Sequence, residues 1–446
     1  MSIRLIESLA TTEPLAAVFS DQSILRAMLD FEVALARAEA RLDVIPRAAA
    51  ETIAKTARDL ATPPELARET LRAGTPAIPL VRLLTERIRA VDEYAARFVH
   101  WGATSQDVSD TALILLLKQA LPLLDADHVR LDNGLRNLSE KHQDTVMLGR
   151  TLLQPAPPIT FGLKAAGWLA AARRGWARIA SRFAEALVLQ FGGASGTLAA
   201  LEDKGLGVGR AIAEELGLSY PDAPWHSHRD RLGALVAACG VETGSLGKMA
   251  RDISLLMQVE AGEASEPGGS GRGSSSTMPH KHNPIACSLA LAAAHRVPGL
   301  VAAFLSGMVQ EHERGIGGWQ AEWPTVAAVV QSTGLSLASM AEVAEGLVVD
   351  RARMRTNIEA TRGIIFAERV MMLLGPALGR DAAHKLLEQA TQQSIAQGRR
   401  LIEILEQMPE ITDLIPRETL SGLDRPEDYL GMANEFRRRL ASGGDD

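Results

Sequence analysis

Five long windows of helix-forming residues restrict the folds open to this chain of 446 residues. Alanine, leucine, methionine, glutamate and arginine fill these windows, and apolar residues recur three and four positions apart. Valine and isoleucine do not alternate with polar residues in short segments, as they do in half-buried strands. We therefore predict an all-α protein with a central bundle of five long helices, at residues 110–141, 159–189, 229–264, 284–310 and 324–349.

The length of these windows also bears on assembly. A helix of about 30 residues is about 45 Å long, which is longer than a compact domain of about 150 residues needs. The windows are rich in alanine and glycine, so neighbouring backbones can approach closely. We expect part of each apolar surface to meet another subunit. Shorter windows outside this region predict three domains, at residues 1–109, 110–350 and 351–446.

Composition and charge disfavour several classes of protein. The chain is 46% hydrophobic and 23% charged, with a net charge of −7 and no long basic block, which argues against nucleic-acid binding. Its N-terminus does not resemble a signal peptide, and its longest uncharged stretch, 324–341, is too polar for a membrane span. Cys239 and Cys287 are too few for the disulfide framework of a secreted protein. We predict a cytoplasmic protein with no membrane partner.

A Gly/Ser-rich segment that leads into the fourth window carries the most specific pattern. It begins at Gly268 and ends in Thr-Met-Pro-His-Lys-His-Asn-Pro, with the last proline at Pro284. We predict that Asn283 caps the following helix and that Pro284 is its first residue. Serine hydroxyls and Lys281 would then lie beside a helix N-terminus, which favours an anion. A flexible linker has a similar composition, but it has no need for these fixed residues at its end.

Three stretches of the chain together resemble the fumarase/aspartase superfamily. Residues 275–284 match the superfamily signature S-S-x-M-P-x-K-x-N. The stretches His-Trp-Gly-Ala-Thr-Ser-Gln-Asp at 100–107 and Gly-Arg-Thr-Leu-Leu-Gln-Pro at 149–155 fall in the superfamily's order along the chain. The resemblance covers nearly the whole chain. It implies a fumarase/aspartase-like three-domain fold, a homotetramer whose sites are each built from three subunits, and a reaction that needs no metal or other cofactor.

The resemblance also implies the residues of the site. The first signature serine, Ser275, matches the residue that transfers a proton at a carbon next to a carboxylate. Because serine is a very weak base in water, a cation such as Lys281 and backbone N–H groups must stabilise its oxyanion. Thr104 and Ser105 match carboxylate-binding positions, although Thr104 and Asp107 also form the pattern of a helix capping box. The other implied substrate-binding residues are Thr151, Gln154, Ser276, Met278, Asn283 and Arg314.

Two departures from the superfamily pattern narrow the choice of member. Most members read G-R-T-H in the second stretch, and that histidine pairs with a glutamate five residues after the signature asparagine. Here the two positions hold Leu152 and Ser288, so both residues of the pair are missing. This joint loss indicates a changed mechanism, and it disfavours a fumarase, an aspartase or an argininosuccinate lyase.

A later stretch separates two further subgroups. Adenylosuccinate lyases carry serines and an arginine there that bind a phosphate, whereas this chain has Trp319, Gln320 and Trp323. Residues 313–323 and 77–81 look instead like those of the 3-carboxy-cis,cis-muconate cycloisomerases. That resemblance implies closure of a tricarboxylate diene to 4-carboxymuconolactone, in the protocatechuate branch (β-ketoadipate pathway) of aromatic degradation.

The implied reaction sets the roles of the site residues. The nucleophile is the substrate's own carboxylate, so the enzyme has to orient three negative groups and deliver one proton. We hypothesise that Ser275 donates this proton, but the loss of the His/Glu pair leaves Lys281, His100 and His280 open as donors. The residues expected to hold the carboxylates are Lys281, Asn283, Thr104, Ser105 and Arg314.

Two other interpretations of the chain stay open. One is a C–N lyase similar to adenylosuccinate lyase. The other is a non-catalytic structural member of the superfamily, although the retained Ser275, Lys281 and Asn283 argue against it. A metal site at His226-x-His228 or His280-x-His282 is disfavoured, because neither pair has further ligands at a suitable spacing.

Overall fold

Long helices dominate the structure, a computed structural model that describes residues 5–61, 65–268, 273, 278 and 281–443. Five of them are α6 (Ser105–Lys141), α7 (Phe161–Ala186), α9 (Asp230–Leu256), α10 (Ile285–Ser306) and α11 (Gly318–Gly346). Each overlaps one predicted window, so the all-α prediction is confirmed. The third window was predicted too long, because α9 ends at Leu256 and not near residue 264.

The other elements are shorter. The remaining α-helices are α1 (Glu13–Val18), α2 (Asp21–Arg41), α3 (Arg47–Arg58), α4 (Leu66–Ala73), α5 (Ala77–Arg89), α8 (Gly205–Leu216), α12 (Arg351–Ala360), α13 (Ala367–Leu378), α14 (Arg380–Gln397), α15 (Leu401–Leu405), α16 (Pro409–Thr412), α17 (Arg417–Leu420) and α18 (Ala433–Ser442). Short 3₁₀ turns lie at Glu7–Leu9, Ala95–Phe98, Ala199–Lys204, Ile364–Phe366 and Pro426–Tyr429. The strands are β1 (Val146–Thr151), β2 (Gln154–Thr160), β3 (Ala264–Ser265) and β4 (Val348–Val349).

The described chain divides into two compact units, each with its own core. Unit 1 comprises Met1–Val129, Arg174–Gly247 and Leu289–Ser339, and unit 2 comprises Arg130–Arg173, Lys248–Ser288 and Met340–Asp446. Boundaries between the units fall inside the long helices, at positions that composition does not mark. The division into domains 1–109, 110–350 and 351–446 stays a prediction.

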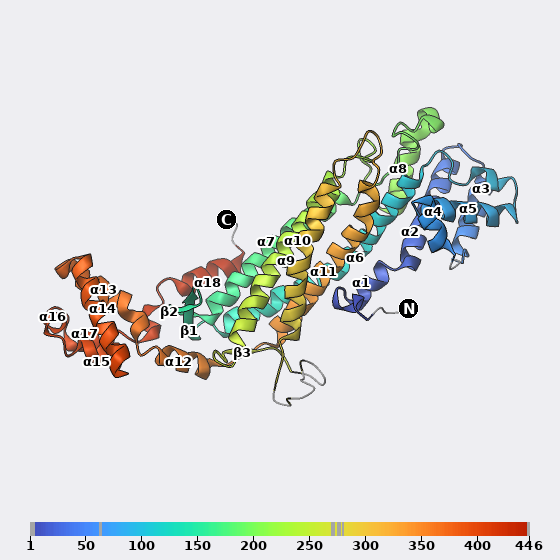
Figure 1. The fold of residues 1–446 in the computed structure, drawn as a ribbon. Helices are drawn as coiled ribbons and strands as arrows, with labels where there is room; N and C mark the ends of the chain where they lie inside the picture. The colour runs from blue at the N-terminus through green and yellow to red at the C-terminus, as the bar shows by residue number, and fades with distance from the viewer. Residues whose placement is uncertain (1–4, 62–64, 269–272, 274–277, 279–280, 444–446) are drawn as a thin grey trace. The chain divides into compact units, whose positions relative to one another are not determined.

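In unit 1, helix α2 packs against α3 and α8, and the helices α2 to α5 lie together (blue in Figure 1). The apolar face of α2 supplies buried residues such as Met28, Phe31 and Leu35 to this core. The parts of the long helices that belong to unit 1 pack closely where one of them carries glycine. A Cβ on Gly334 of α11 would lie 2.1 Å from Leu15 and 2.9 Å from Leu124, so only glycine fits there.

In unit 2, the strands β1 and β2 form an antiparallel hairpin, and β3 pairs with β4. The register of the hairpin shifts between Leu148 and Gly149, where the carbonyl oxygen of Pro157 lies 2.4 Å from the place a Gly149 Cβ would take. Helices α13 to α17 cluster together (orange to red in Figure 1). Their core is aliphatic, with buried residues such as Leu387, Leu401 and Leu405.

Two described helices, α10 and α11, are long and apolar enough to cross a membrane by length and composition alone. That is weak evidence, because core helices of water-soluble proteins have the same properties. In α11, 72% of the most apolar window is buried within the chain, as in a core helix. In α10 only 28% is buried, so a single chain leaves most of an apolar helix uncovered.

Candidate active site

The segment that leads into α6 is held by the carboxylate of Asp107. Its Oδ2 accepts from the backbone N–H of Thr104 at 3.0 Å and from that of Gly193 at 2.9 Å, and its Oδ1 accepts from Gly192 N–H at 3.0 Å. The buried His226 donates to the same carboxylate through Nε2 at 2.7 Å. The capping of α6 by Asp107 is therefore confirmed. It also fixes where Thr104 and Ser105 lie.

Two predicted substrate-binding residues meet at the start of α6. Arg314, which precedes α11, donates through Nη1 to the Thr104 hydroxyl at 2.6 Å. Thr104 therefore does not use its hydroxyl to complete the capping box. Ser105 is the first residue of α6 and is half-buried. Unit 1 thus brings together a guanidinium and a hydroxyl, which are groups that bind carboxylates.

The imidazole of His100 bonds to a buried glutamate of α2. Its Nδ1 donates to Oε1 of Glu32 at 2.6 Å, and Glu32 is only 1% exposed. Burial lowers the pKa of His100, but the charges of Glu32 and Asp107 and the hydrogen bond to Glu32 raise it more, so the pKa lies above its ordinary value. The sequence pattern of α2 did not identify this pair, because the partners are 68 residues apart.

A second buried carboxyl lies on the same face of α2, seven residues further along. Glu39 is fully buried, and neither of its carboxyl oxygens has a hydrogen-bond partner among the described residues. Burial, with a smaller contribution from the charge of Glu32, raises the pKa of Glu39 to about 9. Glu39 is therefore a neutral carboxylic acid at pH 7 in the folded chain.

The Glu39→Gln variant is expected to be more stable than the wild type at pH 8 and nearly equal to it at pH 5. In the unfolded chain this carboxyl ionises near pH 4.3, so its stabilising effect is complete below that pH and is lost as the pH rises towards about 9. The difference at pH 7 should be about 3.7 kcal/mol at most. Melting temperatures measured from pH 5 to pH 8 test this. Glu51→Gln, at an exposed position of α3, is the control, and parallel curves for wild type and Glu39→Gln would contradict the assignment.

A buried network surrounds Arg229, a fully buried residue immediately before α9. Its guanidinium donates to both carboxylate oxygens of Asp110, at 2.7 and 3.0 Å, and to Glu322 at 2.8 Å. Burial opposes the charge of Arg229, but Asp110 and Glu322 outweigh burial and raise its pKa. The sequence signal for this network was the presence of two charged residues, Asp110 and Arg229, at the first positions of two predicted windows.

The two tryptophans that replace a phosphate-binding pattern are part of the same packing. Trp319 is 7% exposed, and its indole N–H donates to Asp110 at 2.9 Å. Its ring packs edge-on against Trp323, with centroids 5.5 Å apart. Gln320 accepts from the backbone N–H of Gly317 at 3.0 Å. These side chains therefore stabilise the start of α11 and offer no cluster of donors to a phosphate.

In unit 2, the hairpin presents the second stretch of the superfamily at its tip. Thr151 and Gln154 pair across the turn and are exposed. Between them Leu152 and Leu153 have φ angles of 50° and 65°, in the left-handed region, and are 98% and 76% exposed. Such a turn favours Asn and Gly, and two leucines in it are strained. Leu152 and Ser288 stand at the two positions of the missing pair, and neither side chain is an acid or base at neutral pH. The hydroxyl of Ser288 donates to the Pro284 carbonyl at 2.6 Å.

The signature segment is described only in part. Ser275, Ser276 and His280 lie outside the described residues. Met278 and Lys281 are exposed, and Asn283 donates to the Gly273 carbonyl through its backbone N–H at 2.9 Å and through Nδ2 at 3.2 Å.

The predicted anion site at the N-terminus of the following helix is wrong. Helix α10 begins at Ile285, and the carboxylate of Glu266 accepts from the backbone N–H groups of Ala286 and Cys287, at 3.1 and 2.7 Å. The side chain of Asn283 bonds to Gly273 and does not cap α10. A protein carboxylate already occupies the place that an anionic ligand would take.

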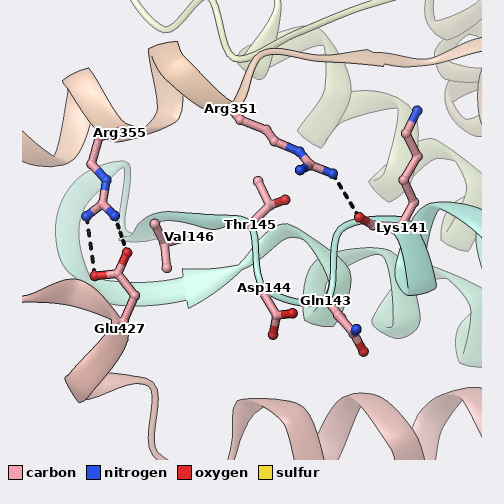
Figure 2. A pocket seen from close by; sticks show the side chains of 8 residues that line it. All are labelled: Lys141, Gln143, Asp144, Thr145, Val146, Arg351, Arg355 and Glu427. Carbon is pink, nitrogen blue, oxygen red and sulfur yellow. Dashed lines mark hydrogen bonds and ion pairs between the residues drawn. The ribbon is translucent and has the colours of Figure 1, made fainter.

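A pocket of about 310 Å³ lies in unit 2, and it includes none of the predicted site residues. Figure 2 shows that its two arginines are used by the protein. Arg351 donates to the Lys141 carbonyl at 3.0 Å, and Arg355 forms an ion pair with Glu427. The pocket is therefore a poor candidate for binding an anionic substrate.

No cluster of three or more histidine, cysteine, aspartate or glutamate side chains suited to a metal occurs in the part of the chain that the structure describes. His226 uses Nε2 to bind Asp107, which removes one nitrogen of the His226-x-His228 pair from metal binding.

Comparison with known proteins identifies the family. A family model described as "Lyase" matches residues 7–299, and a model described as "Adenylosuccinate lyase C-terminus" matches residues 363–440. The chain belongs to this lyase family, and its fold is that of the fumarase/aspartase superfamily, as the three motifs predicted.

Individual relatives narrow the comparison within the family. The chain is 46% identical to the 3-carboxy-cis,cis-muconate cycloisomerase of Bradyrhizobium diazoefficiens, over 98% of this chain and 97% of that protein. It is also 46% identical to the enzyme of the same name from Pseudomonas aeruginosa, over 98% and 95%. The crystal structure of 3-carboxy-cis,cis-muconate lactonizing enzyme from Pseudomonas putida matches with a TM-score of 0.92 and 44% identity, over 98% of both chains.

Proposed function

We propose that the chain is an isomerase that interconverts 3-carboxy-cis,cis-muconate and 4-carboxymuconolactone. The observation that carries this proposal is the 46% identity to cycloisomerases of that name over nearly the full length of both chains. Two features of the chain support it. Leu152 and Ser288 replace the His/Glu pair of other members, and the tryptophans in place of the phosphate-binding pattern are used in packing.

The reaction defines what the site has to supply. A carboxylate oxygen of the substrate forms a C–O bond to one carbon of a double bond, and the π electrons of that bond take a proton at the other carbon. A trianion and one proton therefore give a lactone with two carboxylates. No oxidant, reductant or cofactor enters this balance.

We assign the chemistry to Ser275, Lys281 and His100, and substrate binding to a larger set of residues. The contact between Arg314 and Thr104 supports the binding set, because it places a cation and a hydroxyl side by side at 2.6 Å. The proposed binding residues are Thr104, Ser105, Thr151, Gln154, Ser276, Met278, Asn283 and Arg314.

Arg314→Gln is expected to raise the KM for 3-carboxy-cis,cis-muconate by about 10- to 100-fold, since a charge-assisted contact to a carboxylate is worth about 1.5–3 kcal/mol. The effect should be smaller with cis,cis-muconate, which lacks the 3-carboxyl group. Steady-state kinetics on both substrates test this. Arg89→Gln, at an exposed position in the same unit, is the control. Equal losses on the two substrates would exclude Arg314 as the residue that binds the 3-carboxylate.

We also propose that the chain acts as a homotetramer in the cytoplasm. Helix α10 supports self-association, because only 28% of its most apolar window is buried within one chain. Cys239 and Cys287 are both free and buried, and burial raises the pKa of Cys239 to about 12, which keeps it a thiol. Free thiols suit a reducing compartment. Light scattering on the purified chain tests the oligomeric state.

An adenylosuccinate lyase-like C–N lyase is the second candidate, favoured by the match of residues 363–440 to a model of that name. One assay separates the candidates. The purified chain is mixed with 3-carboxy-cis,cis-muconate, and the absorbance of the diene is followed, with adenylosuccinate in a parallel reaction. Decay of the diene supports the cycloisomerase, activity on adenylosuccinate alone supports the C–N lyase, and inactivity on both supports a structural role.

A further inference from the structure

A buried carboxylate and an imidazole form a pair that no motif of the chain predicts. Glu32 of α2 accepts from Nδ1 of His100 at 2.6 Å. Glu32 is 1% exposed, and its second oxygen, Oε2, is buried without a partner among the described residues. A buried carboxylate with an unsatisfied oxygen is costly unless a nearby group carries positive charge. The geometry therefore favours His100 in its charged form.

The other edge of the His100 ring is available to a ligand. The side chain keeps 19% of its surface exposed, and Nε2 makes no hydrogen bond to any described residue. The backbone of His100 has a φ angle of 59°, in the left-handed region. That conformation is strained for a residue with a side chain, and strain of this kind is concentrated at functional sites.

His100 lies next to the groups proposed to bind the substrate. Four residues further along, the Thr104 hydroxyl accepts from Arg314 at 2.6 Å, and Asp107 fixes the intervening turn through the Thr104 N–H. One short segment of unit 1 thus supplies an imidazole and the hydroxyl to which Arg314 donates. The ring closure needs such a combination, since the proton is delivered to a carbon beside a carboxylate.

We propose that Glu32 positions His100 as an imidazolium, and that His100 delivers from Nε2 the proton that the ring closure consumes. This inference rests on the proposed function. As the carboxylate oxygen forms its C–O bond, the π electrons of the double bond take the Nε2 proton at the neighbouring carbon. His100 is left as a neutral imidazole, and water returns the proton before the next turnover. The pair takes the place of the His/Glu pair that is missing at Leu152 and Ser288.

The charged groups around His100 agree with this role. Burial lowers the pKa of His100, and the charges of Glu32 on α2 and Asp107 on α6 raise it more, so that the ring holds its proton to a higher pH. Glu39, the other acidic residue on this face of α2, is neutral because burial raises its pKa to about 9. The cation that bonds to this segment at the Thr104 hydroxyl is Arg314.

The test is the pH dependence of kcat/KM for 3-carboxy-cis,cis-muconate in the full-length chain. Glu32→Gln keeps a hydrogen-bond acceptor for Nδ1 but removes the charge. The alkaline limb should therefore move down by about one pH unit, with about a tenfold loss of activity at pH 8 that is largely recovered at pH 6. Glu32→Asp retains the charge and should keep the limb near its wild-type position. His100→Gln should lose about 10²- to 10⁴-fold.

Glu39→Gln is the matched control, because it changes a buried carboxyl on the same face of α2 without changing its charge at neutral pH. Its alkaline limb should coincide with that of the wild type. If Glu32→Gln keeps the wild-type limb, or if His100→Gln keeps the wild-type rate, the inference is wrong and Glu32 only ties His100 to α2. If the wild type itself does not consume the diene, the proposed function is wrong. The wild-type assay is therefore done before any variant is made.

Discussion

Ser275→Ala is expected to lower kcat for 3-carboxy-cis,cis-muconate by about 10²- to 10³-fold, the range of a lost hydrogen-bond donor to the charge that develops in the transition state, while the melting temperature stays unchanged. The signature Ser-Ser-x-Met-Pro-x-Lys-x-Asn is intact in the chain, although the acid/base pair of other members is absent. We expect a retained serine at this position to donate a hydrogen bond to a substrate carboxylate as the ring closes. Stopped assays at saturating substrate measure kcat, and circular dichroism checks the fold.

Ser274→Ala provides the control for this variant. Ser274 immediately precedes the signature and has the same side chain, but the superfamily pattern assigns it no role. It should keep kcat within about threefold of the wild type. Equal losses in the two variants would mean that the segment tolerates no alteration, and a wild-type rate in Ser275→Ala would remove this serine from the proposed chemistry.

The positions of the long helices could be predicted from the sequence because helix periodicity is a local property. Each predicted window overlaps a helix, and the errors lie at the ends, as at α9, which ends at Leu256. Helix ends depend on tertiary contacts that periodicity does not record. The N-terminus of α10 is a clear example. Its capping group is Glu266, about twenty residues earlier in the chain, while the prediction placed the cap on the adjacent Asn283.

The candidate site was predictable where short motifs fix residue types. Thr104 and Arg314 were both predicted to bind carboxylates, and the structure joins them across 210 residues of sequence. Glu32 was not predicted, since the helical periodicity of α2 marks only its apolar face. Glu32 and Glu39 are seven residues apart and both lie on the buried side, so an acidic residue at a core position was the signal that could have found them. The partner of Glu32 could not be read from spacing.

The buried network around Arg229 predicts the largest effect on stability. Arg229→Met leaves the carboxylates of Asp110 and Glu322, both buried, without their cation, and breaking a buried pair in this way costs about 3–5 kcal/mol. A large fall in melting temperature is expected. Adding Asp110→Asn and Glu322→Gln to Arg229→Met should restore much of the loss, because the uncompensated charges are then gone.

Arg41→Met is the control, because it breaks an ion pair that is exposed to solvent. Arg41 forms an ion pair with Glu214 at 2.9 Å, but the two side chains are 56% and 73% exposed. Exposed pairs contribute about 0–1 kcal/mol, since water solvates both charges in either state. Arg41→Met should therefore melt close to the wild type. If both variants fell equally, burial would not be the cause. If the triple variant were no more stable than Arg229→Met, the loss would come from the packing of the guanidinium against the Trp225 ring, whose centroid lies 4.6 Å away, and not from unpaired charge.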